Sequence, residues 1–298
     1  MKVFMTGGSG YVGRATIEAL VRRGIEVAAL VRSDASERVV TGLGASAVRG
    51  ELTDVSVLRE AARAADGVLH LGQHAGTDAA EIDRSAAEAM QDGAGPRPYV
   101  HTGGVWVYGD TAGIVDEDAP LNPPRLTAWR VENEKRVLAR ATTGERPVVV
   151  MPGLVYGRSA GLIEMFYAAP GRATGAVPCV GDGSNHWSLV HVEDIAELYV
   201  LALAAPAGSV YAGVSDQNHT ALQVAEALSR AIGRPGAVRH LTMDEATEEM
   251  GPVAEAFALD QRLTGARARR ELGWNPVRLD PLAELAVADR PRTEPAGR

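Results

Sequence analysis

A glycine-rich segment near the N-terminus has the spacing of a dinucleotide-binding turn. Residues 6–13 (TGGSGYVG) follow an apolar stretch that predicts a strand and open a stretch that predicts a helix. In that context Gly7 permits a tight turn, Gly10 lets backbone N–H groups approach a pyrophosphate, and Gly13 allows the helix to pack closely. The positive end of the helix dipole favours the same anion. The alternative interpretation is a glycine-rich turn without a ligand.

A basic residue stands where the second expected strand ends. Dinucleotide-binding folds that select NADH place Asp or Glu here, where the carboxylate binds the ribose 2′-hydroxyl. This chain has Arg32, with Ser33 beside it. A guanidinium binds a 2′-phosphate that a carboxylate would repel, so the sequence favours NADPH, with NADH as the alternative cofactor. Arg32 as a solvated charge at a strand end is the other interpretation.

The first half of the chain alternates apolar β-branched runs with helical patterns, which is typical of an α/β fold with a doubly wound parallel sheet, the Rossmann arrangement. The expected strands cover residues 2–6, 26–31, 46–49, 67–71, 99–102 and 147–151, and the expected helices cover residues 12–23, 55–64, 79–91 and 129–141. A ligand crevice lies outside the carboxyl ends of such strands. We therefore expect a dinucleotide-binding Rossmann domain over residues 1–152.

Residues 153–298 are expected to form mainly a smaller substrate-binding subdomain and lid, with segments that return to the Rossmann sheet. Residues 157–188 show no clean period, so we expect an irregular lid there. Its large apolar residues form either a cover over a flat substrate or ordinary subdomain core: Met165, Phe166, Tyr167 and Trp187. Helices are expected over 192–204 and 220–232, short strands over 209–212 and 237–240, and a frayed tail over 290–298.

The composition favours small-molecule chemistry. The 298 residues carry a formal net charge of −8, so no excess of basic charge would attract nucleic acid or an anionic membrane. Cys179 is the only cysteine, which excludes an intrachain disulfide and a cysteine metal cluster and fits a reducing cytoplasm. No apolar run approaches the roughly 18 residues of a membrane helix. The sequence leaves the oligomeric state open.

Several further motifs make the chain resemble the extended and atypical short-chain dehydrogenases/reductases, among them ketoreductases that act on angucyclinones. These motifs are GELTD at 50–54, GVLHL at 67–71, VYG at 107–109, PGLVYG at 152–157, HVED at 191–194 and ELGWNP at 271–276. The resemblance implies adenine contacts from Glu51 and Leu52, with more weight on the Leu52 backbone because the family's usual residue at 51 is Asp. It also implies contacts along the ribose, pyrophosphate and nicotinamide. The full set of expected cofactor contacts is Gly7, Ser9, Gly10, Tyr11, Val12, Arg32, Ser33, Glu51, Leu52, Leu71, Gly72, Gln73, Thr102, Pro152, Gly153, Leu154 and Val155.

The chain lacks the catalytic groups that the resemblance implies. Such reductases use a Tyr-x-x-x-Lys pair as proton donor and a Ser or Thr that polarises the carbonyl. Lys2 and Lys135 are the only lysines, and Val131 stands four residues before Lys135. Anchoring on the VYG motif puts the serine position at Gly104, and the tyrosine and lysine positions at Trp129 and Asn133. A register shifted by one turn offers Leu126 and Arg130 instead, and neither residue is a phenol.

Three residues remain candidates for catalysis or substrate contact. Thr102 and Tyr108 are expected near the nicotinamide, where each could orient a carbonyl; Thr102 could instead bond backbone or ribose, and Tyr108 could be structural. Trp129 is expected either to stack on a polycyclic aromatic substrate or to pack in the core.

An enzyme without the pair needs a substrate that is already activated. A carbonyl beside a phenolic hydroxyl meets this need, because the phenol polarises the oxygen and supplies the proton. The leading hypothesis is therefore an NADPH-dependent ketoreductase for an aromatic polyketide resembling an angucyclinone. The alternatives are a non-catalytic NADP-binding sensor and a sugar-nucleotide epimerase or dehydratase.

Two other groups of polar residues are not interpreted as functional sites. His70 and His74 straddle a strand end, where their spacing does not bring the side chains together, so no metal is expected. The acidic run Asp116-Glu117-Asp118 precedes Pro120 in an expected surface loop and is interpreted as solvated charge.

Overall fold

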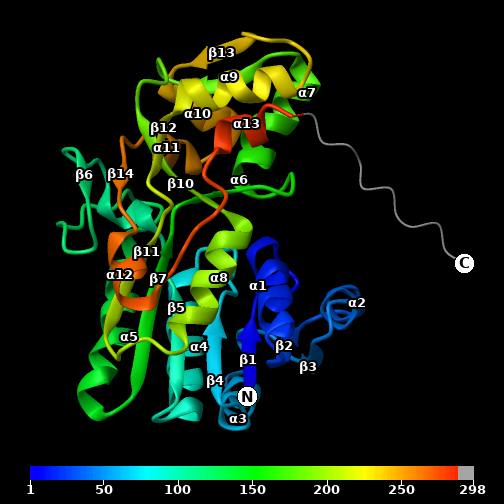
Figure 1. Cartoon of the computed structure of the whole chain (residues 1–298), viewed down its shortest axis with the longest axis vertical. Helices are drawn as coiled ribbons and strands as arrows, with labels where there is room; N and C mark the ends of the chain where they lie inside the picture. Colours follow the sequence, from blue (N-terminus) through cyan, green and yellow to red (C-terminus); the bar gives the residue numbers. More distant parts are fainter. Residues whose placement is uncertain (288–298) are drawn as a thin grey trace, which may run out of the picture.

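A seven-stranded parallel sheet forms the lower half of the molecule in Figure 1, a computed structural model that describes residues 1–287. The expected tail at 290–298 lies outside the described residues. The strand order is β11-β7-β5-β4-β1-β2-β3, and every pairing in it is parallel. The strands are β1 (Lys2–Thr6), β2 (Glu26–Val31), β3 (Ser46–Arg49), β4 (Gly67–His70), β5 (Pro98–Thr102), β7 (Arg146–Pro152) and β11 (Ser209–Gly213). The predicted fold class is confirmed, and all six strands expected in the first half occur within one residue of their expected ends.

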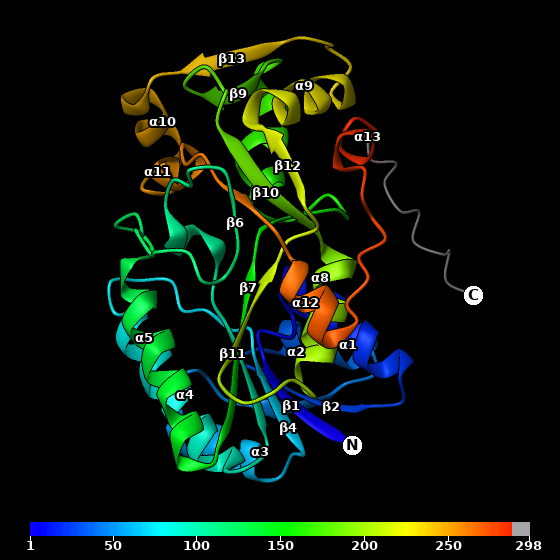
Figure 2. The same ribbon diagram turned by 60° about the vertical axis from the view of Figure 1, so that its left-hand side comes forward.

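Helices cover both faces of this sheet, which explains why its central strands are apolar on both sides. Figure 2 separates the two layers. One face carries α1 (Tyr11–Arg22), α2 (Asp34–Gly42), α8 (Val192–Ala202) and α12 (Ala266–Leu272), and the other carries α3 (Val55–Arg63), α4 (Ala79–Ala94) and α5 (Ala128–Ala139). In α1 the buried residues Gly13, Thr16, Ile17 and Leu20 recur at helical spacing and face the sheet. No helix among residues 1–287 is both long and apolar enough to cross a bilayer.

The upper part of the molecule is built on three small sheets. Strand β10 (His186–His191) pairs with β8 (Leu154–Tyr156) and β12 (Gln217–Thr220), β9 (Val177–Val180) pairs with β13 (Val238–Leu241), and β6 (Ile114–Val115) pairs with β14 (Arg262–Leu263). The helical segments around them are α6 (Gly161–Ile163), η3 (Glu164–Ala168), α7 (Ala169–Thr174), α9 (Ala221–Ala231), α10 (Met243–Met250), α11 (Val253–Phe257) and α13 (Pro281–Leu285), with η1 (Val105–Tyr108) and η2 (Arg140–Thr143) in the lower half. The division of domains at residue 152 stays a prediction, although β11, α8 and α12 do pack with the large sheet.

The expected irregular lid over residues 157–188 is wrong. This segment forms α6, η3, α7, β9 and the start of β10. Tyr167 and Trp187 are buried and pack edge to face with centroids 5.0 Å apart, and both also contact Phe257. Met165 is exposed. Two of the aromatic side chains therefore belong to the subdomain core, because only together do they exclude water from the layer between β10 and α11.

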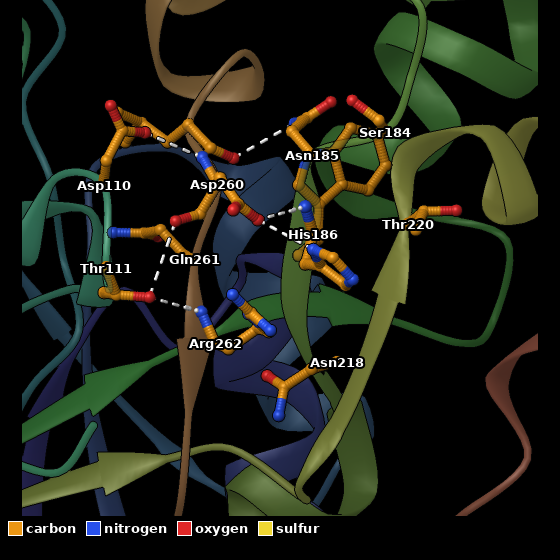
Figure 3. A network of polar contacts seen from close by, with 12 residues as sticks. Asp110, Thr111, Ser184, Asn185, His186, Asn218, Thr220, Asp260, Gln261 and Arg262 are labelled. Atoms are coloured by element: carbon orange, nitrogen blue, oxygen red, sulfur yellow. Dashed lines mark hydrogen bonds and ion pairs between the residues drawn. The ribbon is translucent and has the colours of Figure 1, made fainter. Parts of the chain in front are cut away.

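A polar network fastens the upper part to the loop after η1, and Figure 3 shows it from close by. The Asp260 carboxylate accepts hydrogen bonds from the backbone and the Nδ1 of His186, both at 2.8 Å, and the Asp260 N–H donates to Asp110 at 2.8 Å. The Arg262 N–H donates to Thr111 Oγ1 at 2.9 Å. The network holds β14 beside β6, and thereby fixes the upper part over the carboxyl edge of the sheet.

The acidic loop also has a structural role, so its interpretation as solvated charge is wrong for Glu117. The Glu117 side chain is fully buried, accepts the Ala212 N–H at 2.8 Å and pairs with Arg267 at 3.4 Å. Burial raises the pKa of Glu117. The carboxylate thus binds the edge strand β11, whose outer N–H groups would otherwise lack a partner.

Candidate active site

Two adjoining cavities lie along the carboxyl edge of the large sheet. The glycine-loop cavity, about 450 Å³, is lined by the turn after β1 and by the ends of β2, β3 and β4: Gly7, Ser9, Gly10, Leu30, Val31, Arg32, Ser36, Gly50, Glu51, Leu52, Thr53, Leu71, Gly72, Gln73, His74 and Ala75. The α5 cavity, about 790 Å³, shares Gln73, His74 and Ala75 with it. These shared residues place the two cavities side by side. They straddle the point where the strand order reverses between β1 and β4, which is where doubly wound sheets bind ligands.

Backbone contacts explain the glycines of the turn. Gly7 has a φ of +73°, and a Cβ there would come within 2.6 Å of the Leu71 carbonyl carbon. A Cβ on Gly13 would come within 2.0 Å of the Gly7 oxygen. Only glycine fits at either position, because the turn, the start of α1 and the end of β4 pack directly against one another. The N-cap of α1, Gly10, offers no side chain to the first N–H groups, which leaves them free for an anion.

Arg32 lines the glycine-loop cavity and has no carboxylate partner among the described residues. Asp34 and Glu37, the acidic residues nearest to it in sequence, both pair with Arg49 instead. The Arg32 guanidinium is therefore available to an anionic group at this end of the cavity.

Ser33 does not line the cavity, which corrects its expected role. It is the N-cap of α2, and its hydroxyl accepts the Ser36 N–H at 3.2 Å in a capping box. Capping uses the Ser33 side chain, and Ser36, one turn later, lines the cavity in its place.

The α5 cavity brings together most of the remaining expected residues. Its lining is Tyr11, Val12, Gln73, His74, Ala75, Gly76, Thr77, Ala79, Ala80, Gly103, Gly104, Val105, Trp106, Arg125, Leu126, Thr127, Trp129, Arg130, Pro152, Gly153, Leu154, Val155, Gly161, Leu162 and Val253. Trp129 therefore faces the cavity and is not plain core. Gly103 and Gly104 contribute only backbone at the end of β5, so the wall beside a bound nicotinamide would carry no hydroxyl.

Two expected catalytic residues are placed elsewhere. Tyr108 is buried outside the lining, and its hydroxyl donates to the Glu117 carbonyl at 3.3 Å. Burial raises its pKa. Thr102 also lies outside both linings, and its hydroxyl is bonded to the Tyr199 hydroxyl at 2.9 Å. The Tyr108 and Thr102 side chains therefore make structural contacts here. The turn of η1 points Tyr108 away from the sheet edge.

Among the described residues, Tyr11 supplies the one phenol in the cavity wall, and this phenol is engaged in a structural bond. It donates to the Gly157 carbonyl at 2.6 Å, and its ring packs against Gly161. Burial, together with the Glu284 charge, raises the pKa of Tyr11. Tyr11 therefore fastens the loop after β8 to α1 and is a poor proton donor.

His74, by contrast, was considered in the sequence only as a metal ligand. It lines both cavities and pairs with Asp78 at 3.2 Å, not with His70.

Helix α5 also presents a cation that the sequence marked only through its alternative register. Arg130 lines the cavity with its guanidinium carbon 4.5 Å from the centroid of the Trp129 ring, and it donates to the Thr102 carbonyl at 3.4 Å. One turn later, Glu134 is buried against Gly103, and its Oε1 has no hydrogen-bond partner. Burial raises the pKa of Glu134 to about 8. Sequence gave no signal for this, because a Glu four residues after an Arg ordinarily predicts an exposed ion pair.

A second carboxyl group, Asp83 of α4, lies in the same buried layer. Its Oδ1 is 3.4 Å from His70 Nε2, its Oδ2 is 3.8 Å from His101 Nε2, and Asn133 donates to Oδ2 at 2.9 Å. Burial opposes ionisation of Asp83, but contacts with His70, His101 and Asn133 outweigh it and lower its pKa. Burial lowers the pKa of His101 to about 3.

Asp83, His70 and His101 have potential ligand atoms within 4.8 Å of one another, a grouping that the sequence did not predict. Each imidazole also bonds a hydroxyl through Nδ1, His70 that of Thr6 and His101 that of Tyr99. The absence of a metal stays a prediction.

Comparison with known proteins agrees with this geometry. The model of the NAD dependent epimerase/dehydratase family matches residues 3–212. The chain is similar to an uncharacterized protein of Saccharomyces cerevisiae, 30% identical over 96% of this chain and 98% of the relative. It is also similar to 4-hydroxy-2-methyl-3-oxo-4-farnesyl-3,4-dihydroquinoline-1-oxide ketoreductase of Stigmatella aurantiaca, 33% identical over 71% of this chain and 67% of the relative.

Among solved structures, dTDP-glucose 4,6-dehydratase of Bacillus anthracis in complex with NAD superimposes with a TM-score of 0.79 at 17% identity, covering 96% of this chain and 94% of that one. The chain belongs to the NAD-dependent epimerase/dehydratase family, a family of extended short-chain dehydrogenases/reductases. Membership places it among NAD(P)-dependent oxidoreductases and epimerases.

Proposed function

We propose that this protein is an NADPH-dependent ketoreductase that reduces a carbonyl of an aromatic polyketide resembling an angucyclinone. The observation that carries the proposal is the α5 cavity, which adjoins the glycine-loop cavity and is walled by Trp106, Leu126 and Trp129 without a Tyr-Lys pair. A volume of about 790 Å³ with aromatic and aliphatic walls suits a flat polycyclic molecule.

NADPH lies across the carboxyl edge in this proposal, with its pyrophosphate at the start of α1 and its nicotinamide beside residues 152–155. The unpaired Arg32, close to the N-terminus of α2, supports a 2′-phosphate over a hydroxyl at the adenosine end. NADH remains the alternative cofactor.

The reaction transfers hydride from NADPH to the carbonyl carbon, and the neighbouring phenol of the substrate protonates the resulting alkoxide. General acid catalysis is worth roughly 10²–10⁴-fold, or about 3–5.5 kcal/mol. Correct positioning of hydride donor and acceptor is worth about 7–11 kcal/mol. In this proposal the α5 cavity holds the substrate ring against the nicotinamide, so the chain can use the larger contribution, which comes from positioning.

The Stigmatella aurantiaca relative supports the ketone class. By its name that enzyme is a ketoreductase for a bicyclic 3-oxo compound with a hydroxyl on the neighbouring carbon. Only the ketone class carries over as support, because C4 of that compound bears both the hydroxyl and the farnesyl group, so the hydroxyl is an alcohol and not the phenol that the proposed mechanism uses.

Two alternatives predict different behaviour. A non-catalytic sensor would bind NADPH and consume none, which fits the missing pair but leaves the α5 cavity without a use. A sugar-nucleotide epimerase or dehydratase must remove a hydroxyl proton. Within residues 1–287, the only tyrosine that lines the cavity is Tyr11, and its hydroxyl donates to the Gly157 carbonyl.

The test follows NADPH absorbance with a panel of hydroxylated polycyclic ketones and quinones and traces deuterium from 4-deuterated NADPH into the product. We expect label on the carbinol carbon, and we expect methylation of the neighbouring phenol to abolish turnover. Full turnover of the methylated ketone would refute the substrate-derived proton. His74→Gln tests the histidine of the cavity wall as an alternative donor. A loss of kcat above 100-fold at an unchanged KM for NADPH would assign the proton to His74 instead.

A further inference from the structure

Arg130 is one of two arginines that line the α5 cavity, and it is half-buried whereas the other, Arg125, is exposed. Among residues 1–287 no carboxylate lies within 4.0 Å of the Arg130 guanidinium. The guanidinium carbon lies 4.5 Å from the centroid of the Trp129 ring, and Nη1 donates to the Thr102 carbonyl at 3.4 Å. Cavity arginines with so few partners attract anionic groups of ligands, because the low dielectric strengthens each charge.

The carboxyl group that would ordinarily neutralise Arg130 is held back by burial. Glu134 stands four residues later on α5, the spacing of a helical ion pair. Its side chain instead fills the space beside Gly103, where a Cβ would meet Oε1 at 2.6 Å. Burial raises its pKa to about 8, Arg130 opposes this, and the negative Asp83 on α4 adds to it. Near pH 7 Glu134 is therefore mostly uncharged, and the Arg130 charge is not cancelled.

The charged and titratable groups around Glu134 determine whether it ionises. On its own helix it faces Arg130, from α4 the ionised Asp83 acts on it, and from η1 the Tyr108 phenol lies close enough to be affected by its charge. Gly103, which follows β5, and Met151 of β7, which lies beside Gly103, are not titratable.

We propose that Arg130 is the oxyanion-binding residue of the cavity, and that its guanidinium stabilises the alkoxide formed by hydride transfer and the phenolate left when the substrate phenol protonates that alkoxide. The inference rests on the proposed function and assigns the charge stabilisation within it. Atoms and charges balance in this step. The carbonyl carbon gains the hydride from NADPH, which becomes NADP⁺, and the alkoxide oxygen gains the phenolic proton. The negative charge ends on the phenolate beside Arg130.

A binding experiment tests Arg130 without turnover. The probe is 5-hydroxy-1,4-naphthoquinone bound to the full-length protein loaded with NADP⁺, with the phenolate absorbance followed against pH. We expect the bound phenol to ionise at least one pH unit lower than the free probe in the wild type and in Arg125→Gln, the matched control on the rim of the same cavity. In Arg130→Gln the shift should disappear. A shift that survives in Arg130→Gln, or is lost only in Arg125→Gln, overturns the assignment.

Kinetics provide the second readout. Loss of one oxyanion donor typically costs 10²–10³-fold in kcat, so Arg130→Gln should lose that much kcat while the KM for NADPH stays within about threefold. Arg130→Lys should recover part of the loss, which shows that charge and not only packing is required. Equal kcat in the wild type and Arg130→Gln refutes the inference and leaves the ketoreductase intact. If the wild type transfers no deuterium at all, the proposed function fails, and the probe titration still decides whether Arg130 binds oxyanions.

Glu134 gives the pH signature. Because its ionisation would neutralise Arg130, kcat of the wild type should fall as pH rises through about 8. Glu134→Gln should keep the neutral-pH rate within about threefold and show a smaller alkaline decline than the wild type, because ionisation of the substrate phenol still removes the proton source at high pH. A decline of the same size in Glu134→Gln would show that ionisation of Glu134 does not control the charge of Arg130.

Discussion

Asp83 and Glu134 show how neighbouring groups set the charge of a buried carboxyl. Both are buried, yet the pKa of Asp83 is lowered and that of Glu134 is raised to about 8. Asp83 has an amide donor and two imidazoles around it, whereas Glu134 Oε1 has no partner. Once Asp83 is ionised, a second negative charge in the same layer is disfavoured. The immediate contacts of each carboxyl group therefore decide whether it is ionised.

Arg32→Glu should reverse the cofactor preference. A carboxylate at this position repels the 2′-phosphate and accepts a hydrogen bond from a ribose 2′-hydroxyl. We expect kcat/KM for NADPH to fall by at least tenfold and that for NADH to rise, measured by steady-state kinetics with the same ketone. Arg38→Glu serves as the charge-matched control, because Arg38 is exposed on α2 and does not line the cavity. An unchanged ratio in Arg32→Glu would show that Arg32 does not read the phosphate.

Gly103→Ala and Gly104→Ala should differ although they are adjacent. A Cβ on Gly103 would meet Glu134 Oε1 at 2.6 Å, whereas a Cβ on Gly104 meets nothing within 4 Å. Overpacking of this kind costs about 1–3 kcal/mol, so Gly103→Ala should lower the free energy of unfolding by that amount. Gly104→Ala should change it by less than about 0.5 kcal/mol. Urea unfolding of both variants makes the comparison, and equal stabilities would contradict the placement of Glu134.

At the scale of elements, a single side chain holds the cavity wall that η1 forms. Gln261 Nε2 donates to the carbonyl of Val105 at 3.0 Å and to that of Gly109 at 2.7 Å, one at each end of η1. Val105 and Trp106 of η1 line the α5 cavity. Gln261 belongs to the segment that the Asp260 network fixes (Figure 3). Elements distant in sequence therefore meet here to shape the substrate site.

Gln261→Leu should loosen this wall. It leaves two carbonyls without their donor, and an unmet buried hydrogen bond costs about 1–3 kcal/mol. We expect a loss of about 2–4 kcal/mol in unfolding free energy, together with a higher KM for the ketone at an unchanged KM for NADPH. Chemical denaturation and steady-state kinetics measure these effects. A rise in the KM for NADPH of the same size would mean that η1 supports the cofactor and not the substrate.

At the scale of the whole molecule, Glu134 links stability to pH. Its folded-state pKa, about 8, is above its ordinary value of 4.5, so the folded chain retains a proton that the unfolded chain releases. The stability is fully present below pH 4.5, declines as pH rises from there to about 8, and levels off above the folded-state pKa, where both states are ionised. The slope that this group adds is at most about 1.4 kcal/mol per pH unit.

The difference between wild type and Glu134→Gln isolates this contribution, because other titrating groups cancel. Relative to Glu134→Gln, the wild type should become progressively less stable between pH 5.5 and 8.5. Urea unfolding at pH 5.5, 7.0 and 8.5 measures the difference. A constant difference across this range would show that Glu134 is ionised already at the lowest pH.

The sequence by itself determined the doubly wound sheet, the glycine turn, the position of Arg32 and the absence of a Tyr-Lys pair. These features depend on local periodicity, on backbone clearance at single glycines and on residue identity, all of which can be read along the chain. Anchoring on the VYG motif also placed Trp129 at the family's tyrosine position, with Leu126 in a register shifted by one turn, and this register stays a prediction.

Only the tertiary structure decided where several side chains point. It turned Tyr108 and Thr102 away from the cavity, used Ser33 as a helix cap, buried Glu117 against β11 and built Tyr167 and Trp187 into a core. It alone separated Arg130 from Glu134, although their spacing on α5 predicts an ion pair. The physical reason is that burial and hydrogen-bond partners come from segments far away in sequence, and these partners fix both the direction of a side chain and its charge.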